Sequence, residues 1–106
     1  MTEHQLAFKH NVRVLPDPAS GGVIDVGPYK RASVSLSSAV GAEARTLKAP
    51  TSENQEVTLS FAVDNGTITV TCTDGPVLTF DDAGDLQVIR SYLNGTTLTW
   101  KKIIDV

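Results

Sequence analysis

The chain has 106 residues, of which 41% are hydrophobic and 20% are charged, and its formal net charge is −3. A chain of this length forms one domain with a modest core. The small acidic excess argues against a nucleic-acid partner, and the nearest thing to a basic patch is Arg90, Lys101 and Lys102. No apolar run approaches the ~20 residues of a membrane span, so we expect no membrane partner.

The N-terminus and the cysteine count bear on where the protein is made. The first residues, Met1 to His4, lack the positive and then apolar pattern of a secretory signal. Cys72 is the single cysteine, and one thiol cannot form a disulfide within the chain. We therefore expect synthesis in a cytosol and a fold that depends on packing or on partners.

Residues 1–22 are predicted to be an N-terminal arm and linker. The arm carries the apolar residues Leu6, Phe8, Val12 and Val14. Prolines and a glycine pair within 16–22 interrupt any strand ladder and separate this arm from the rest of the chain. The arm could hold an edge strand. The alternative is a frayed terminus, because termini are poorly ordered unless they are tied down.

Residues 23–106 are predicted to be a single β-domain. Short segments alternate apolar and polar side chains, which is typical of half-buried strands, and turn residues separate them. The expected strands are 23–26, 29–37, 45–49, 57–63, 67–73, 77–80, 86–92 and 96–104. This pattern predicts an all-β fold, namely a small antiparallel β-sandwich or barrel with an extended N-terminal arm.

The clearest local signal is the Asn-Gly pair at 65–66. It lies between two alternating segments, 57–63 and 67–73, and Asn-Gly favours the two-residue turn of a β-hairpin. We therefore expect these two strands to pair, and neighbouring strands to be mostly antiparallel. Trp100 is the largest candidate for the core, and we expect it to be buried together with Phe61 and Phe80.

Metal ligands are the first chemistry to consider. Asp81, Asp82 and Asp85 form the densest carboxylate cluster, and hard cations take oxygen ligands from such loops. Asp and Gly also favour turns for conformational reasons, so we interpret 81–85 as a turn. His4 and His10 have no Cys or Asp at ligand spacing, whereas zinc needs three or four converging ligands. We expect no metal and no cofactor.

Catalytic and sugar-binding patterns are equally weak. Cys72 shares a strand face with Ile68 and Val70, which predicts a small buried hydrophobe rather than a nucleophile with a histidine base. The threonines of 67–73 could bind sugar or ice, yet threonine rows are also what solvent-facing strands prefer. The chain has no phosphate loop, no G-x-S-x-G motif and no paired catalytic carboxylates, so we do not expect an enzyme.

Several motifs together resemble a β-domain found in tailed-phage structural proteins. They are R-T-L-x-x-P at 45–50, the E-V-T-L strand at 56–59, D-x-G-T-x-T-V-T at 64–71, D-x-G-D at 82–85 and N-G-T-x-x-x-W at 94–100. Such domains occur in head-decoration, head-fibre and tail-fibre proteins. A small copy with a loose N-terminal arm is similar to capsid decoration (cement) proteins of the lambda-like kind. The resemblance implies a homotrimer on the capsid surface of the virion and supplies no catalytic residues.

The sequence therefore predicts a non-enzymatic capsid decoration protein, made in the host cytoplasm, that binds the major capsid protein lattice and stabilises the mature head. The arm residues Leu6, Phe8, Val12 and Val14 would contact a capsid subunit or a neighbouring protomer by adding a strand to a sheet edge. The alternative is a glycan- or host-surface-binding module of a phage fibre. That alternative needs exposed aromatic side chains, and an exposed Trp100 beside Tyr92 would favour it.

Overall fold

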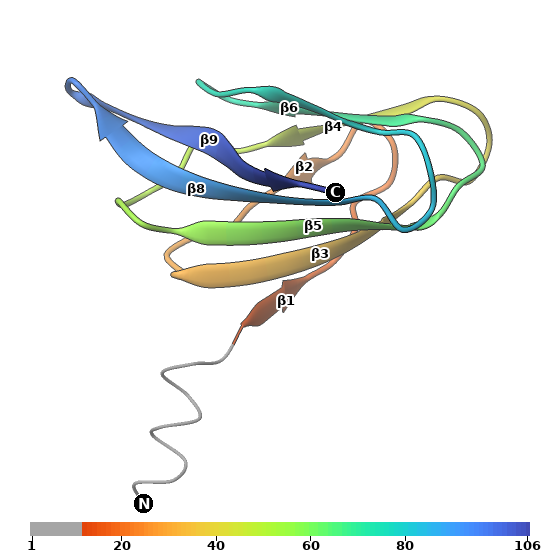
Figure 1. Ribbon diagram of the computed structural model, residues 1–106, viewed down its shortest axis with the longest axis horizontal. Helices are drawn as coiled ribbons and strands as arrows, with labels where there is room; N and C mark the ends of the chain where they lie inside the picture. The colour runs from red at the N-terminus through yellow and green to blue at the C-terminus, as the bar shows by residue number, and fades with distance from the viewer. Residues whose placement is uncertain (1–11) are drawn as a thin grey trace, which may run out of the picture.

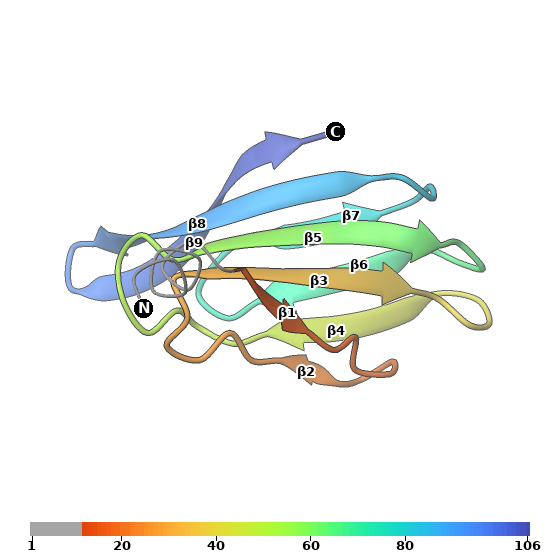
Figure 2. The same cartoon turned by 90° about the horizontal axis from the view of Figure 1, so that it is seen from below.

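The computed structural model describes residues 12–106, which form two facing layers of strands (Figure 1). Within this range the strands are β1 (Arg13–Leu15), β2 (Val23–Ile24), β3 (Arg31–Ser37), β4 (Glu43–Leu47), β5 (Glu56–Val63), β6 (Ile68–Cys72), β7 (Val77–Phe80), β8 (Leu86–Asn94) and β9 (Thr97–Asp105). The five-stranded sheet has the order β1-β3-β5-β8-β9, and the four-stranded sheet has the order β2-β4-β6-β7. Figure 2 looks onto the outer face of the five-stranded sheet.

The core lies between the two sheets. Alternate residues of each strand point inward, so β3 buries Ala32, Val34 and Leu36 while the serines between them stay partly or fully exposed. The inward side chains of both sheets form one apolar cluster. The prediction of an all-β sandwich is confirmed, and the two sheets do not close into a barrel.

The direction of strand pairing differs from the sequence-based expectation. The chain crosses from the five-stranded to the four-stranded sheet three times, after β1, β3 and β5. Because these crossings stack in the same direction, β1, β3 and β5 pair in parallel, and so do β2, β4 and β6. Antiparallel pairing joins β5 to β8, β6 to β7 and β8 to β9. The expectation that neighbours are mostly antiparallel was therefore wrong for the first six strands.

The Asn-Gly pair explains this error. The two segments that it joins, β5 and β6, lie in different sheets, so they do not form the predicted hairpin. Gly66 has φ of +150°, and a Cβ atom there would collide with the carbonyl of Gly41. The Gly41 amide also donates a hydrogen bond to the Asn65 carbonyl at 2.8 Å. Gly66 is thus required because two sheet-crossing turns touch, not because a hairpin closes.

The part of the predicted arm and linker that the structure describes is anchored to the sandwich. Leu15 joins the core with 9% exposure, although Pro16 and Pro18 follow it. The Arg45 side chain, 1% exposed, pairs with Asp17 at 2.6 Å and with Glu43 at 3.0 Å. A buried guanidinium must be paired, so this contact holds the connection between β1 and β2 on β4. The described part of the arm and linker expected at residues 1–22 is therefore in contact with the sandwich.

Trp100, Phe61 and Phe80 occupy the core as expected. Trp100 is 2% exposed, and Phe61 and Phe80 pack edge to face with ring centroids 6.3 Å apart. The indole Nε1 of Trp100, on β9, donates a hydrogen bond to the Lys48 carbonyl at 2.9 Å, just after β4. Trp100 therefore links the two sheets, and its predicted core position is confirmed.

Candidate functional site

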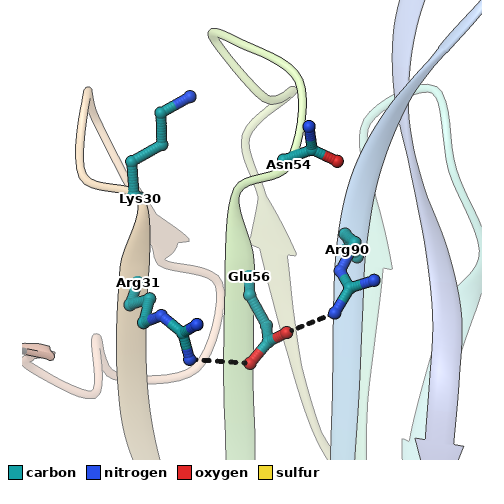
Figure 3. Close-up of a pocket in the computed structure, with 5 residues that line it drawn as sticks. All are labelled: Lys30, Arg31, Asn54, Glu56 and Arg90. Carbon is teal, nitrogen blue, oxygen red and sulfur yellow. Dashed lines mark hydrogen bonds and ion pairs between the residues drawn. The ribbon is translucent and has the colours of Figure 1, made fainter. Parts of the chain in front are cut away.

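The outer face of the five-stranded sheet carries a groove with charged walls. It encloses about 430 Å³ and is lined by Lys30, Arg31, Asn54, Glu56 and Arg90, which we call the charged groove (Figure 3). The strand register makes Arg31, Glu56 and Arg90 direct neighbours on β3, β5 and β8. The residues next to them along each strand, such as Val57 and Ile89, point to the opposite face and are buried. The charged side chains therefore face solvent in one row across three strands.

Glu56 lies between the two arginines. Arg90 Nη2 donates a hydrogen bond to Glu56 Oε1 at 2.9 Å, and Arg31 Nη1 lies 3.7 Å from Oε2. The arginine side chains are 61% and 49% exposed, whereas that of Glu56 is 25% exposed. The groove holds three cations and one carboxylate, a formal charge of +2 in a chain of net charge −3. It is therefore a site of positive potential.

Lys30 closes one end of the groove. Its Nζ donates hydrogen bonds to Ser52 Oγ at 3.1 Å and to the Glu53 carbonyl at 3.0 Å. Asn54 has φ of +63°, a left-handed conformation that asparagine tolerates. Its backbone N–H donates a hydrogen bond to the Ser91 carbonyl at 3.1 Å. These contacts fasten the connection between β4 and β5 to β3 and β8.

Gln55 fixes the same connection from inside the protein. The residue is fully buried, and its Oε1 accepts hydrogen bonds from the Thr51 amide at 2.7 Å and the Ser52 amide at 3.2 Å. Its Nε2 donates to the carbonyls of Gly27 at 2.8 Å and Tyr29 at 2.9 Å. A buried amide with all of these partners holds its surroundings in one arrangement. The loops beside the charged groove are thus preorganised.

Arg90, Lys101 and Lys102, the nearest thing to a basic patch in the sequence, are only partly brought together. Lys101 lies opposite Arg90 in the backbone register of β8 and β9 and extends the row of cations onto β9. Its Nζ lies 5.5 Å from the ring centre of Tyr92. Lys102 pairs instead with Asp105 at 3.3 Å, and alternation points it to the opposite face from Lys101. Sequence reasoning did not identify Lys30, Arg31 or Glu56 as site residues. Alternation places Arg31 on the outward face, but it does not determine which strands lie beside it.

Two of the predicted partner-binding residues lie on or beside the edge strand β1. Val14 is 74% exposed and pairs in register with Ser33 of β3, and Val12 is 47% exposed. Leu6 and Phe8 lie outside the described residues. β1 adjoins β3, which carries Arg31, so this edge and the charged groove lie next to each other on the same sheet.

The other candidate residues serve the fold. Asp85 Oδ2 accepts hydrogen bonds from the amides of Asp81 at 2.9 Å and Asp82 at 3.0 Å, so this carboxylate stabilises the turn. Residues 12–106 contain no group of three or more potential metal ligands. Cys72 is buried, as predicted, and burial raises the pKa of its thiol to about 12. A thiol that stays protonated is a poor nucleophile. His4 and His10 lie outside the described range.

The position of Trp100 bears on the glycan alternative. The exposed Trp100 beside Tyr92 that would favour this alternative is absent, because Trp100 is 2% exposed while Tyr92 is 37% exposed. Among residues 12–106 there is no helix long and apolar enough to cross a membrane. No protein-family model and no curated protein matches the chain.

Proposed function

We propose that the protein is a non-enzymatic capsid decoration (cement) protein that binds the assembled head of a tailed phage and stabilises it. The resemblance of the motifs between 45 and 100 supports this proposal, together with the all-β sandwich. The observation that carries it is the edge strand β1. Among the described strands β1 has one neighbour, β3, and it carries the exposed Val14 on its outer face.

Strand addition is the mode of attachment that this edge favours. A short edge strand can accept an extended segment through main-chain hydrogen bonds, and alternate side chains then give specificity. Val12 and Val14 supply apolar surface of the kind that a partner would cover. β1 differs from the long edge strand β9, which carries Lys101 and Lys102, because charged residues, lysine above all, discourage edge-to-edge pairing.

Stabilisation of the head follows from mass action. A protein that binds the assembled lattice but not its separated subunits shifts the equilibrium toward the lattice. A contact that spans a boundary between two capsid subunits meets this condition. No bond is made or broken in such a mechanism, so it needs no catalytic residue.

Cosedimentation with purified heads of the phage that encodes the chain tests this proposal. The protein should pellet with expanded heads and not with unexpanded ones. The variant Val14→Lys should weaken this binding tenfold or more, or about 1.4 kcal/mol. The reason is that a lysine on an edge strand opposes strand addition. Deletion of residues 1–11 should weaken binding in the same way.

Val40→Lys is the matched control, because Val40 is 87% exposed and lies in the turn between β3 and β4, away from the β1 edge. It should leave binding unchanged, and all variants should keep the melting temperature of the parent. Failure of the protein to pellet with expanded heads would contradict the proposal. Equal binding by Val14→Lys and the parent would contradict attachment through β1.

The proposed assembly state is a homotrimer, as the resemblance implies. Small domains often gain stability from oligomerisation, and closed point-group symmetry is its usual form. Native mass spectrometry of the free protein and of protein released from heads should show a trimer. A strict monomer in both samples would contradict this part of the proposal.

A further inference from the structure

We propose that the charged groove binds an acidic segment of a partner protein through carboxylate side chains. This inference does not rest on the capsid proposal, since it concerns the charges and hydrogen-bond donors of the groove residues and can be tested without phage heads. It follows from three properties of Lys30, Arg31, Glu56 and Arg90: the charge they carry, the donors they leave available, and the loops that hold them.

The donors come first. A guanidinium group has five N–H donors in a planar fork that matches a carboxylate. Within residues 12–106 the Arg90 side chain donates one hydrogen bond, to Glu56, and Arg31 lies 3.7 Å from the same carboxylate, beyond hydrogen-bond distance. Most donors of both arginines are therefore available on side chains that are half exposed or more. Each guanidinium can therefore donate hydrogen bonds to one ligand carboxylate, so the site can bind two carboxylates.

The spacing indicates how these carboxylates would be arranged. β3 and β8 flank β5, so Arg31 and Arg90 start from backbones two strand spacings apart, about 10 Å. Acidic residues three positions apart in a polyproline II segment, which has three residues per turn and rises about 3.1 Å per residue, lie on one face about 9 Å apart. An extended segment that lies across the strands could thus place one acidic side chain on each arginine, with Lys30 at the end of the groove.

The walls are preorganised, which lowers the entropic cost of binding. Arg90 donates a hydrogen bond to Glu56, and Lys30 is held by Ser52 and Glu53. Gln55 fixes the loop that carries Asn54. Glu56 also limits the charge of the site, so the groove suits a ligand with a few carboxylates.

Carboxylates of a protein fit this surface better than the two other common polyanions. The surplus charge of +2 is small and the chain as a whole is acidic, so a nucleic acid would be repelled by the rest of the surface. None of the five lining residues is aromatic, whereas sugar rings usually stack on aromatic side chains. We therefore assign the groove to an acidic peptide segment.

The test is a titration followed by two-dimensional NMR of the 15N-labelled full chain. The probe is a capped peptide of sequence Gly-Glu-Gly-Ser-Glu-Gly, and the comparison peptide has Gln in place of both Glu. The acidic peptide should produce saturable shifts at 30, 31, 54, 56 and 90, and binding should weaken between about 20 mM and about 300 mM salt because screening increases. The Gln peptide should produce none.

Two variants change the site in opposite directions. Arg31→Gln combined with Arg90→Gln removes both forks and should lower the affinity about tenfold or more, since hydrogen bonds to charged groups are the stronger kind. Glu56→Gln removes the competing carboxylate and should raise the affinity several-fold. A variant that only unfolded the sheet could not strengthen binding, so this second variant keeps the test decisive.

The matched controls are Lys48→Gln and Asp25→Asn. These two residues form an exposed ion pair at 3.5 Å, with both side chains 59% exposed, beside the four-stranded sheet. Each control substitution changes the net charge of the chain by one unit, as each groove substitution does. They should leave the affinity for the acidic peptide unchanged.

Four outcomes would overturn the assignment. The first is the absence of saturable shifts at the groove at low salt, and the second is an equal response of the control variants, which would reduce the effect to long-range charge. The third is saturation of the same residues by a heparin fragment but not by the peptide. The fourth is concentration-dependent shifts of the groove residues in the chain alone, because the carboxylates would then come from a second copy.

Discussion

Trp100 offers the most direct test of how the two sheets are held together. It is the only tryptophan, it is 2% exposed, and its indole bridges from β9 to the Lys48 carbonyl at 2.9 Å. The substitution Trp100→Ala removes both the apolar contact and this hydrogen bond. Neither can be replaced locally, because the cavity opens between two sheets that are fixed by their own strand pairing.

The expected loss can be worked out from these two terms. A buried aromatic side chain covers roughly 150–250 Å², worth about 4–6 kcal/mol at ~25 cal/mol/Å². Measured aromatic-to-alanine substitutions in cores cost about 3–5 kcal/mol. A domain of this size has a total stability of about 5–15 kcal/mol. Trp100→Ala should therefore lower the melting temperature by about 12–20 °C at ~4 °C per kcal/mol.

Far-ultraviolet circular dichroism measures both quantities, the melting temperature in a thermal scan and the free energy of unfolding in urea, since the variant has no tryptophan fluorescence. Trp100→Phe separates the two terms: it keeps most of the apolar contact, leaves the Lys48 carbonyl without its partner, and should cost about 1–3 kcal/mol. Tyr92→Ala, on the neighbouring strand and 37% exposed, is the control and should cost less than about 1 kcal/mol. A loss below about 1 kcal/mol for Trp100→Ala would refute this account of the core.

Three further predictions concern single residues. Gln55→Leu should cost about 2–4 kcal/mol and speed amide exchange at residues 51 and 52, because it leaves several buried polar groups without partners. Gly66→Ala should cost more than about 2 kcal/mol in urea unfolding, since its Cβ would meet the Gly41 carbonyl. Burial raises the pKa of Cys72 from 9.0 to about 12, so its contribution to stability is complete below pH 9.0 and is lost as the pH rises through about 12. Urea unfolding between these pH values should show a decline that is smaller in Cys72→Ala, and an identical decline in both proteins would contradict the shift.

Local alternation determined much of this fold from the sequence. A period of two in apolar residues is a property of a single strand, so it identified the buried face of β3, β5 and β6 without knowledge of their neighbours. The same rule placed Cys72 and Trp100 in the core. The turn at 81–85 was also predictable, because Asp and Gly favour turns through contacts within a few residues.

Strand partnership was decided only in the tertiary structure. An Asn-Gly pair permits a tight reversal, but the reversal can return along the same sheet or cross to the opposite one. Here the chain crosses to the opposite sheet, and Gly66 meets Gly41 of another crossing turn. Within each sheet the first six strands therefore pair in parallel. The distant ion pair of Asp17 with Arg45 likewise anchors a segment that its prolines marked as a linker.

The charged groove depends on this same nonlocal choice. Arg31, Glu56 and Arg90 are far apart in the sequence, and each by itself is an ordinary exposed charge on an alternating strand. They become one site because β5 pairs in parallel with β3 on one side and antiparallel with β8 on the other. The period of a strand fixes which face a side chain occupies, whereas only the order and register of strands fix which side chains share that face.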